Sequence, residues 1–183
     1  MTSSKKLTKR IVDINRPIHY YVEGECEAKL INALKTGKDN FKRPGKVEVF
    51  NVIRDRISKF RIAALKRNTI IVLVYDVDVR RVNILDENIR LLESAGFSYI
   101  NHIQSLDCFE DEIVYSSSLN DINDCFKTER VNGFKARFIE HKDILTKLKS
   151  IGFNPKKIWS RVNQRSPFAI YSRQSSLDFI HRF

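Results

Sequence analysis

The chain has few of the residues that build disulfide-stabilised, zinc-binding or membrane-spanning proteins. Its three cysteines, Cys26, Cys108 and Cys125, are an odd number without a C-x-x-C spacing, which argues against a disulfide framework and a zinc ribbon. The longest apolar run, residues 70–75, is far shorter than the roughly 20 residues that cross a bilayer. The first ten residues are polar and lack the apolar segment of a secretory signal. We therefore expect a cytoplasmic protein without a membrane partner.

Positive charge is abundant. Lys and Arg total 33 against 22 acids in 183 residues, which gives a formal charge of +11. Residues 142–183 hold nine Lys or Arg against two acids, whereas residues 107–124 are acidic. This balance favours a nucleic acid as partner, because basic proteins gain affinity by releasing counterions from phosphates. A generically basic protein without such a partner would show the same total charge.

Hydrophobic patterning predicts alternating strands and helices in the first two thirds of the chain. Short runs rich in β-branched and aromatic residues are typical of strands at residues 17–22, 46–51, 69–75 and 97–103. Apolar residues at helical spacing lie between them, at residues 25–35, 55–66 and 84–95. This order predicts an α/β, Rossmann-like fold with a parallel sheet of about four strands and flanking helices.

Beyond the fourth strand the pattern becomes helical and less regular. We expect helices at residues 110–116, 119–126, 134–151 and 156–162, with a break in the third near residues 141–143. Residues 166–171 read as a short strand or an extended arm. No linker interrupts the chain, so we expect one domain with a core at about residues 17–116 and a basic helical extension at about residues 117–183.

Acidic residues follow two of the predicted strands. Glu23 ends the first, before Gly24 permits a tight turn, and Asp76 and Asp78 end the third. Ligands of parallel sheets bind beyond the carboxyl ends of the strands, and residues two apart in an extended chain point to the same side. Converging carboxylates repel each other unless a cation lies between them, and Mg²⁺ or Mn²⁺ prefers oxygen ligands. We therefore predict a divalent metal site here.

Two segments resemble a known family. Residues 22–27 (VEGECE) and 75–78 (YDVD) are similar to the signature motifs of the Toprim domain, in which a glutamate ends one strand and D-x-D ends a later one. Topoisomerases, bacterial primases, small RNA-processing nucleases and OLD-type (overcoming lysogenization defect) nucleases of phage defence share that domain. The resemblance covers residues 18–103, and the chain looks closest to the OLD-like branch. It has no room for the extra modules of topoisomerases or primases.

The OLD-like resemblance implies further metal ligands. Glu27 matches a second glutamate four residues after the first, and Glu110 and Glu112 match an acidic pair after the fourth strand. One ion would then be held by Glu23, Asp76 and a later acid, and a second ion by Glu27 with the remaining acids, Asp78 among them. An exposed helix start would explain Glu27 and residues 109–113 equally well, because acids favour the first turn of a helix.

The resemblance also implies a catalytic lysine near the metals, which would stabilise charge on the phosphate or protonate the leaving oxygen, and Lys156 and Lys157 are the candidates. An ordinary solvated pair is the alternative. By their charge, the residues expected to contact nucleic acid are Lys149, Lys156, Lys157, Arg161, Arg165 and Arg173. The neighbouring aromatic residues either stack on bases or form a small hydrophobic cluster; these are Trp159, Phe168 and Tyr171.

The function predicted from these features is that of a metal-dependent endonuclease that hydrolyses phosphodiester bonds of RNA or DNA, in phage defence or nucleic-acid processing, with Glu23, Asp76 and Asp78 as catalytic residues. The alternative is a non-catalytic Toprim-like module that binds nucleic acid or a nucleotide and partners an ATPase, since the chain has no phosphate-binding G-x-x-x-x-G-K-[ST] loop of its own. A receiver-like phospho-acceptor domain fits less well, because only one acid ends the first strand.

Overall fold

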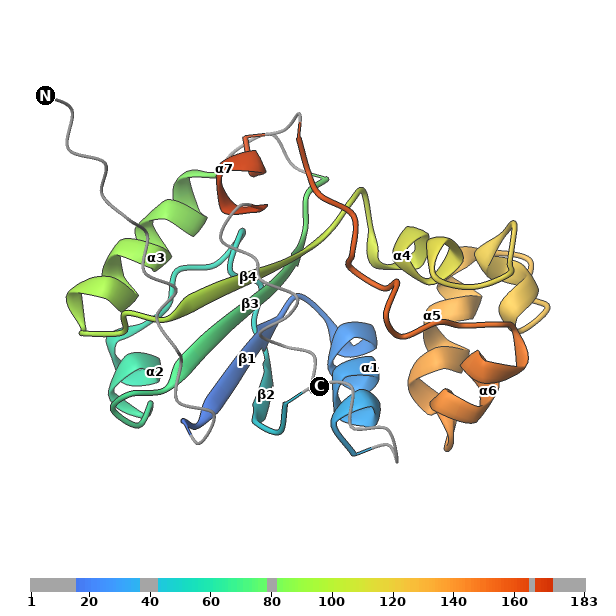
Figure 1. Ribbon diagram of the computed structural model, residues 1–183, viewed down its shortest axis with the longest axis horizontal. Coiled ribbons are helices and arrows are strands. Elements are labelled where there is room, and N and C mark those ends of the chain that lie inside the picture. The colour runs from blue at the N-terminus through green and yellow to red at the C-terminus, as the bar shows by residue number, and fades with distance from the viewer. Residues whose placement is uncertain (1–15, 37–42, 79–81, 165–166, 173–183) are drawn as a thin grey trace, which may run out of the picture.

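A computed structural model describes residues 16–36, 43–78, 82–164 and 167–172 of the chain (Figure 1). Its centre is a four-stranded sheet in the order β2-β1-β3-β4, in which every neighbouring pair is parallel. The strands are β1 (Ile18–Val22), β2 (Lys46–Val49), β3 (Ile70–Asp76) and β4 (Ile100–Ser105). The predicted α/β fold with a parallel sheet and flanking helices is therefore confirmed.

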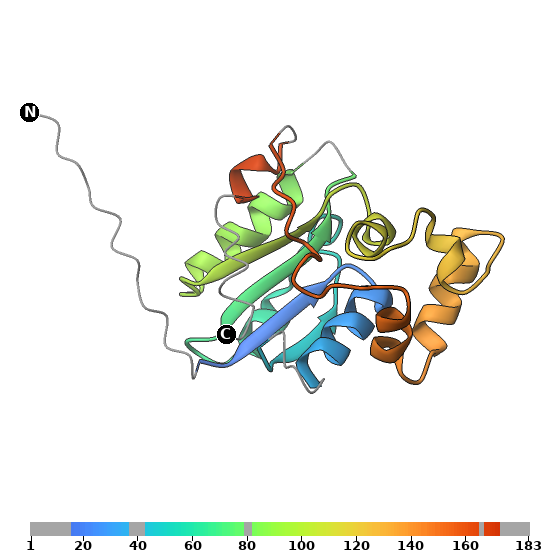
Figure 2. The same ribbon diagram turned by 45° about the vertical axis from the view of Figure 1, so that its right-hand side comes forward.

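Helices cover both faces of the sheet (Figures 1 and 2). One face packs against α1 (Glu25–Thr36) and a helical lobe, which consists of α4 (Phe109–Tyr115), the 3-10 turn η1 (Ile122–Cys125), α5 (Val131–Glu140) and α6 (Ile144–Ser150). The other face packs against α2 (Lys59–Ala63), α3 (Asn83–Ser94) and α7 (Ala169–Ser172). No helix in the described ranges has the length and apolarity needed to cross a membrane.

The central strand β3 explains why the sheet needs cover on both sides. Ile70, Val72 and Val74 belong to the core beneath α1, while Ile71 and Leu73 belong to the opposite core beneath α3. Side chains of a strand alternate between faces, so a continuous apolar run such as this one is stable only when both faces are buried. All five of these side chains are fully buried.

The predicted break near residues 141–143 is present, because α5 ends at Glu140 and α6 begins at Ile144. Asp143 caps α6 by accepting a hydrogen bond from the Thr146 amide at 3.1 Å. Of the helix expected at residues 119–126, only the 3-10 turn η1 forms. The fourth strand begins at Ile100 rather than residue 97, since Phe97 closes the end of α3 through a hydrogen bond to Leu92.

Two expectations for the end of the chain are wrong. Residues 156–162 form turns and extended chain instead of a helix, and the Trp159 backbone has a φ of +57°, which no α-helix allows. Its amide donates to the carboxylate of Glu112 rather than to a helical carbonyl. Residues 169–172 form the short helix α7 instead of a strand, and Gln104 of β4 binds the carbonyl of Phe168 just before it.

Candidate functional site

The candidate site lies between the carboxyl ends of β1 and β3. The chain leaves β1 for β2 on one side of the sheet and returns to β3 on the other side, and Val22 pairs with Val74. This is the point at which the strand order reverses, where open parallel sheets bind their ligands. Glu23 follows β1 directly, and Asp76 is the last residue of β3.

Glu23 links the ends of three strands. Its Oε1 accepts a hydrogen bond of 2.9 Å from the side-chain amide of Asn51, which lies beyond the end of β2. Its Oε2 accepts a hydrogen bond of 3.0 Å from the backbone amide of Asp76. The structure therefore brings Glu23 and Asp76 together. It adds Asn51, which the sequence interpretation missed although this residue is the last one of the strand predicted at residues 46–51.

The carboxyl group of Asp76 has few hydrogen bonds or positive charges to stabilise its ionised form. Within the described residues, its Oδ1 atom is buried and has no hydrogen-bond partner. The pKa of Asp76 is raised to about 8, mainly by burial and also by the charges of Glu23, Glu27 and Glu110, while a hydrogen bond with Ser105 partly offsets the shift. Most Asp76 side chains are therefore protonated at neutral pH unless another positive charge takes the place of the proton.

Two buried glutamates from different helices complete the group. Glu27 lies in the first turn of α1, and burial raises its pKa to about 7, with the charges of Glu23 and Glu110 adding to the shift. Gly24 leaves room for it, because a Cβ atom at that position would lie 3.1 Å from Glu27 Oε2. Glu110 lies in the first turn of α4 and is 5% exposed. We call Glu23, Glu27, Asp76 and Glu110 the carboxylate cluster.

A lysine from the helical lobe contacts this cluster. Lys135 of α5 places its Nζ atom 3.1 Å from Glu110 Oε1. Burial lowers the pKa of Lys135, but its hydrogen bond to Glu110 and the nearby Cys26 and Glu27 outweigh this effect and raise it. Sequence reasoning placed the lysine at Lys156 or Lys157, both of which are exposed. Lys157 lies over the ring of Tyr115, with its Nζ 6.0 Å from the ring centroid.

Glu112 has a different role from the one expected. It is fully buried, and its Oε1 accepts from the Leu106 amide at 3.1 Å and from Arg161 Nη2 at 2.6 Å, while its Oε2 accepts from the Trp159 amide at 3.0 Å. Residues two apart on a helix point in nearly opposite directions, so Glu110 and Glu112 of α4 cannot face one ion together. Glu112 instead anchors residues 159–161 to the end of β4.

Asp78 also stands apart from the cluster. It is exposed two residues beyond the end of β3, and residues 79–81 lie outside the described ranges. The alternation that would put Asp76 and Asp78 on the same side applies to a continuous strand, whereas β3 ends at Asp76. Of the three residues predicted to meet, the structure brings together Glu23 and Asp76.

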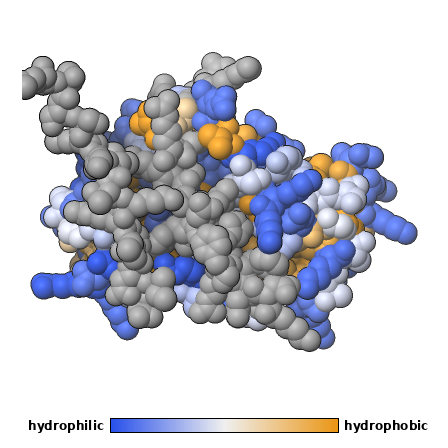
Figure 3. Space-filling view, viewed as in Figure 1, coloured by the Kyte–Doolittle hydropathy of each residue, from blue (hydrophilic) through white to orange (hydrophobic). Residues whose placement is uncertain are grey.

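The residues expected to contact nucleic acid differ in their surroundings. Lys149, Lys156 and Lys157 are exposed, Arg161 binds Glu112, and Arg165 and Arg173 lie outside the described residues. Figure 3 shows hydrophilic residues on several separate parts of the described surface in this view.

The aromatic residues that were candidates for base stacking are buried instead. Trp159 is 3% exposed, and its indole N–H donates to Ser105 Oγ at 3.2 Å. Phe168 and Tyr171 pack into the opposite core, beneath α7. These residues are therefore buried, as the hydrophobic alternative implies, but they are divided between two cores instead of forming one small cluster.

No protein-family model, curated protein or solved structure matches the chain. The resemblance to Toprim domains therefore stays a prediction. Among the residues that the structure describes, no three His, Cys, Asp or Glu side chains stand ready to surround a metal ion. The donor chemistry nevertheless suits a hard cation, because Mg²⁺ is commonly held by one or two carboxylates with waters and substrate phosphates as its other ligands.

Proposed function

We propose that the chain is a divalent-cation-dependent phosphodiesterase acting on nucleic acid, with the carboxylate cluster as its cation site. The observation that carries this proposal is the buried, unpartnered Oδ1 of Asp76 with three other carboxylates around it. Natural proteins rarely leave a buried carboxylate without compensation, and such groups concentrate at functional sites. Its position at the reversal of strand order adds independent support.

A cation would relieve the electrostatic cost of the cluster. Removing the protons from Asp76 and Glu27 adds negative charge to a group of carboxylates that already raises the pKa of both residues. A divalent ion supplies the missing positive charge and needs oxygen ligands, which all four members provide. We assign Asp76 and Glu23 as its primary ligands, since they are adjacent, and Glu27 and Glu110 as groups that add charge or bind through water.

The surrounding residues have supporting roles in this proposal. Asn51 and the Asp76 amide hold the Glu23 carboxylate in place. Lys135 is the candidate for binding a phosphate oxygen, because its ammonium group already lies among the carboxylates. When bound, a divalent ion makes water a better nucleophile and stabilises negative charge on the phosphate. The formal charge of +11 would attract a polyanionic substrate.

Cleavage assays test the proposal directly. Purified protein is incubated with labelled structured RNA, single-stranded DNA and plasmid DNA, with Mn²⁺ or with a chelator. We expect cleavage only with the ion, and a loss on the order of 10²-fold or more in Asp76→Asn and Glu23→Gln, as for other groups that stabilise transition-state charge. Glu25→Gln is the matched control, because Glu25 is exposed in the same helical turn as Glu27.

A second candidate is a non-catalytic module that binds nucleic acid or a nucleotide and works with an ATPase. It is favoured by the lack, in the described part of the chain, of a ready group of three metal-binding side chains. In that case nucleic-acid binding would persist in the chelator and in Asp76→Asn, and no substrate would be cut. Activity that appears with Mn²⁺ and disappears in Asp76→Asn would exclude this candidate.

A further inference from the structure

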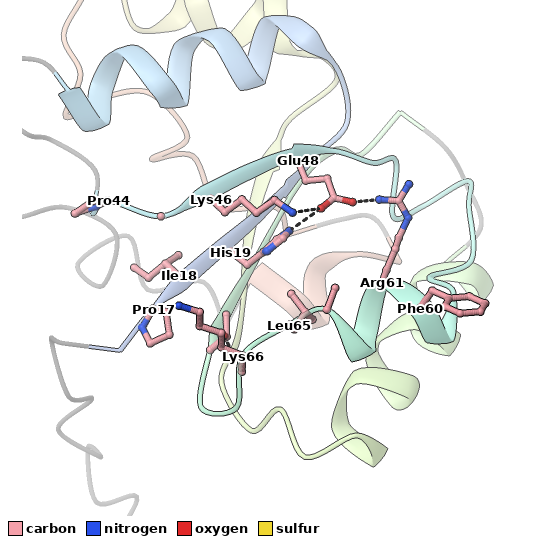
Figure 4. Close-up of a pocket in the computed structure, with 13 residues that line it drawn as sticks. Pro17, Ile18, His19, Pro44, Lys46, Glu48, Phe60, Arg61, Leu65 and Lys66 are labelled. Atoms are coloured by element: carbon pink, nitrogen blue, oxygen red, sulfur yellow. Dashed lines mark hydrogen bonds and ion pairs between the residues drawn. The ribbon is translucent and has the colours of Figure 1, made fainter.

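A separate cavity lies at the opposite end of the sheet. It has a volume of about 690 Å³ and is formed by the beginnings of β1 and β2 together with α2 and the turn that leads into β3 (Figure 4). His19 at the cavity and Glu23 at the carboxylate cluster are four residues apart along β1, which corresponds to roughly 13 Å in a strand. The cavity is thus distinct from the candidate cation site.

The cavity has an apolar floor. Ile18, Ala64 and Leu65 contribute to its lining, and Pro17 and Pro44 stand at one end of it (Figure 4). Gly45 lets the starts of β1 and β2 approach closely, because a Cβ atom at this position would lie 2.5 Å from the Ile18 carbonyl oxygen. A volume of this size accommodates a small organic molecule, and ligand cavities are commonly apolar with a few charged groups.

Charged residues form one wall of the cavity. Glu48 Oε2 lies 3.3 Å from His19 Nε2 and 3.2 Å from Lys46 Nζ, and Glu48 Oε1 pairs with Arg61. Figure 4 shows these three side chains reaching toward Glu48, while Lys66 lies on the side of Pro17. His19 is neutral at physiological pH, because burial lowers its pKa to about 4. Glu48 therefore pairs with two permanent cations, Lys46 and Arg61, and the exposed Lys66 adds a third positive charge to the lining on the side of Pro17.

We propose that this cavity binds a small organic anion with a flat apolar body, whose charged group lies among Lys46, Arg61 and Lys66. The apolar floor suits the body of such a ligand, and the excess of positive charge suits its anionic group. A neutral ligand would fill the apolar part of the cavity but make no use of these cations, two of which already pair with Glu48. A cationic ligand would add to the repulsion.

The test uses anilinonaphthalene sulfonate, a flat apolar anion, with the full chain. Binding is followed by fluorescence titration, and its position by amide NMR. We expect saturable binding of one probe molecule, with the largest NMR shifts at Ile18, Lys46 and Leu65. The neutral analogue N-phenylnaphthylamine, which lacks the sulfonate, should bind weaker by about tenfold or more.

Two variants and a control locate the site. Ala64→Trp fills the cavity from an exposed position, and Lys66→Glu reverses one charge without removing the backbone carbonyl that binds Thr69. Each should weaken probe binding by about tenfold or more, whereas Lys59→Glu, an exposed position of α2 outside the lining, should leave it unchanged. The proposal would be overturned if binding failed to saturate or if all variants had equal affinity for the probe. Equal binding of the neutral analogue, or NMR shifts confined to other regions, would overturn it as well. These outcomes do not depend on nuclease activity.

Discussion

Replacing Asp76 by asparagine is expected to stabilise the protein near neutral pH. The ordinary pKa of this carboxyl group is 3.8, and in the fold it is raised to about 8. Between these two values the native state keeps the proton and the unfolded chain releases it, so stability falls as pH rises through this window. At pH 7, about 3 pH units above the ordinary pKa and at about 1.4 kcal/mol per unit, protonation costs on the order of 4 kcal/mol.

Asparagine has nearly the same shape but no charge to neutralise, so it avoids this cost. We expect Asp76→Asn to be more stable than the natural chain by about 2–4 kcal/mol at pH 7, and the difference to shrink toward pH 4. Urea unfolding in a chelator at several pH values measures both curves, with Asp78→Asn as the control because Asp78 is exposed. Parallel curves, or a less stable Asp76→Asn at every pH, would refute the reasoning.

Three further predictions concern the cation, the lysine and the buried ion pair. Mn²⁺ should raise the unfolding temperature at about pH 8 and lose this effect toward about pH 5. At the lower pH protons occupy Asp76 and Glu27, whose pKa values are raised to about 8 and about 7. Equal stabilisation at both pH values would contradict this prediction. Lys135→Met should lower the cleavage rate by about 10- to 100-fold, as for other groups next to a metal site, while Lys157→Met should leave it unchanged. The same rate in both variants would show that Lys135 has no role in cleavage. Arg161→Ala should destabilise the fold by roughly 3–5 kcal/mol in urea unfolding, because it leaves Glu112 buried without its cation. The double variant Arg161→Ala with Glu112→Gln should recover part of this loss. No loss of stability in the single variant would show that the pair contributes little.

The sheet could be predicted because its signals are local. The apolar run at residues 70–75 has the composition of a strand buried on both faces, and Gly96 marks the end of a helix with a φ of +91°. Placing Glu23 and Asp76 at the same edge required only the rule that parallel strands end together. These inferences depend on neighbours in the sequence and on general topology.

The errors arise from contacts between distant parts of the chain. Trp159 has a positive φ and donates its amide to Glu112, which is 47 residues away, so local helix propensity could not reveal this turn. Lys135 of α5 reaches Glu110 of α4, and nothing within residues 131–140 signals that contact. Glu112 points away from Glu110 because both lie on the helix that was predicted there, and residues two apart on a helix do not face the same side.

The central claim is that the carboxylate cluster binds a divalent cation. Anomalous scattering from a crystal soaked in Mn²⁺ tests this claim most directly. The soak is done at about pH 8, because Asp76 and Glu27 lose their protons there. The account predicts one strong peak within coordination distance of Asp76 Oδ1 and a Glu23 oxygen, and no such peak in Asp76→Asn crystals. Mn²⁺ found only at other positions, or a cluster without any peak while Asp76 keeps its buried oxygen unpartnered, would contradict it.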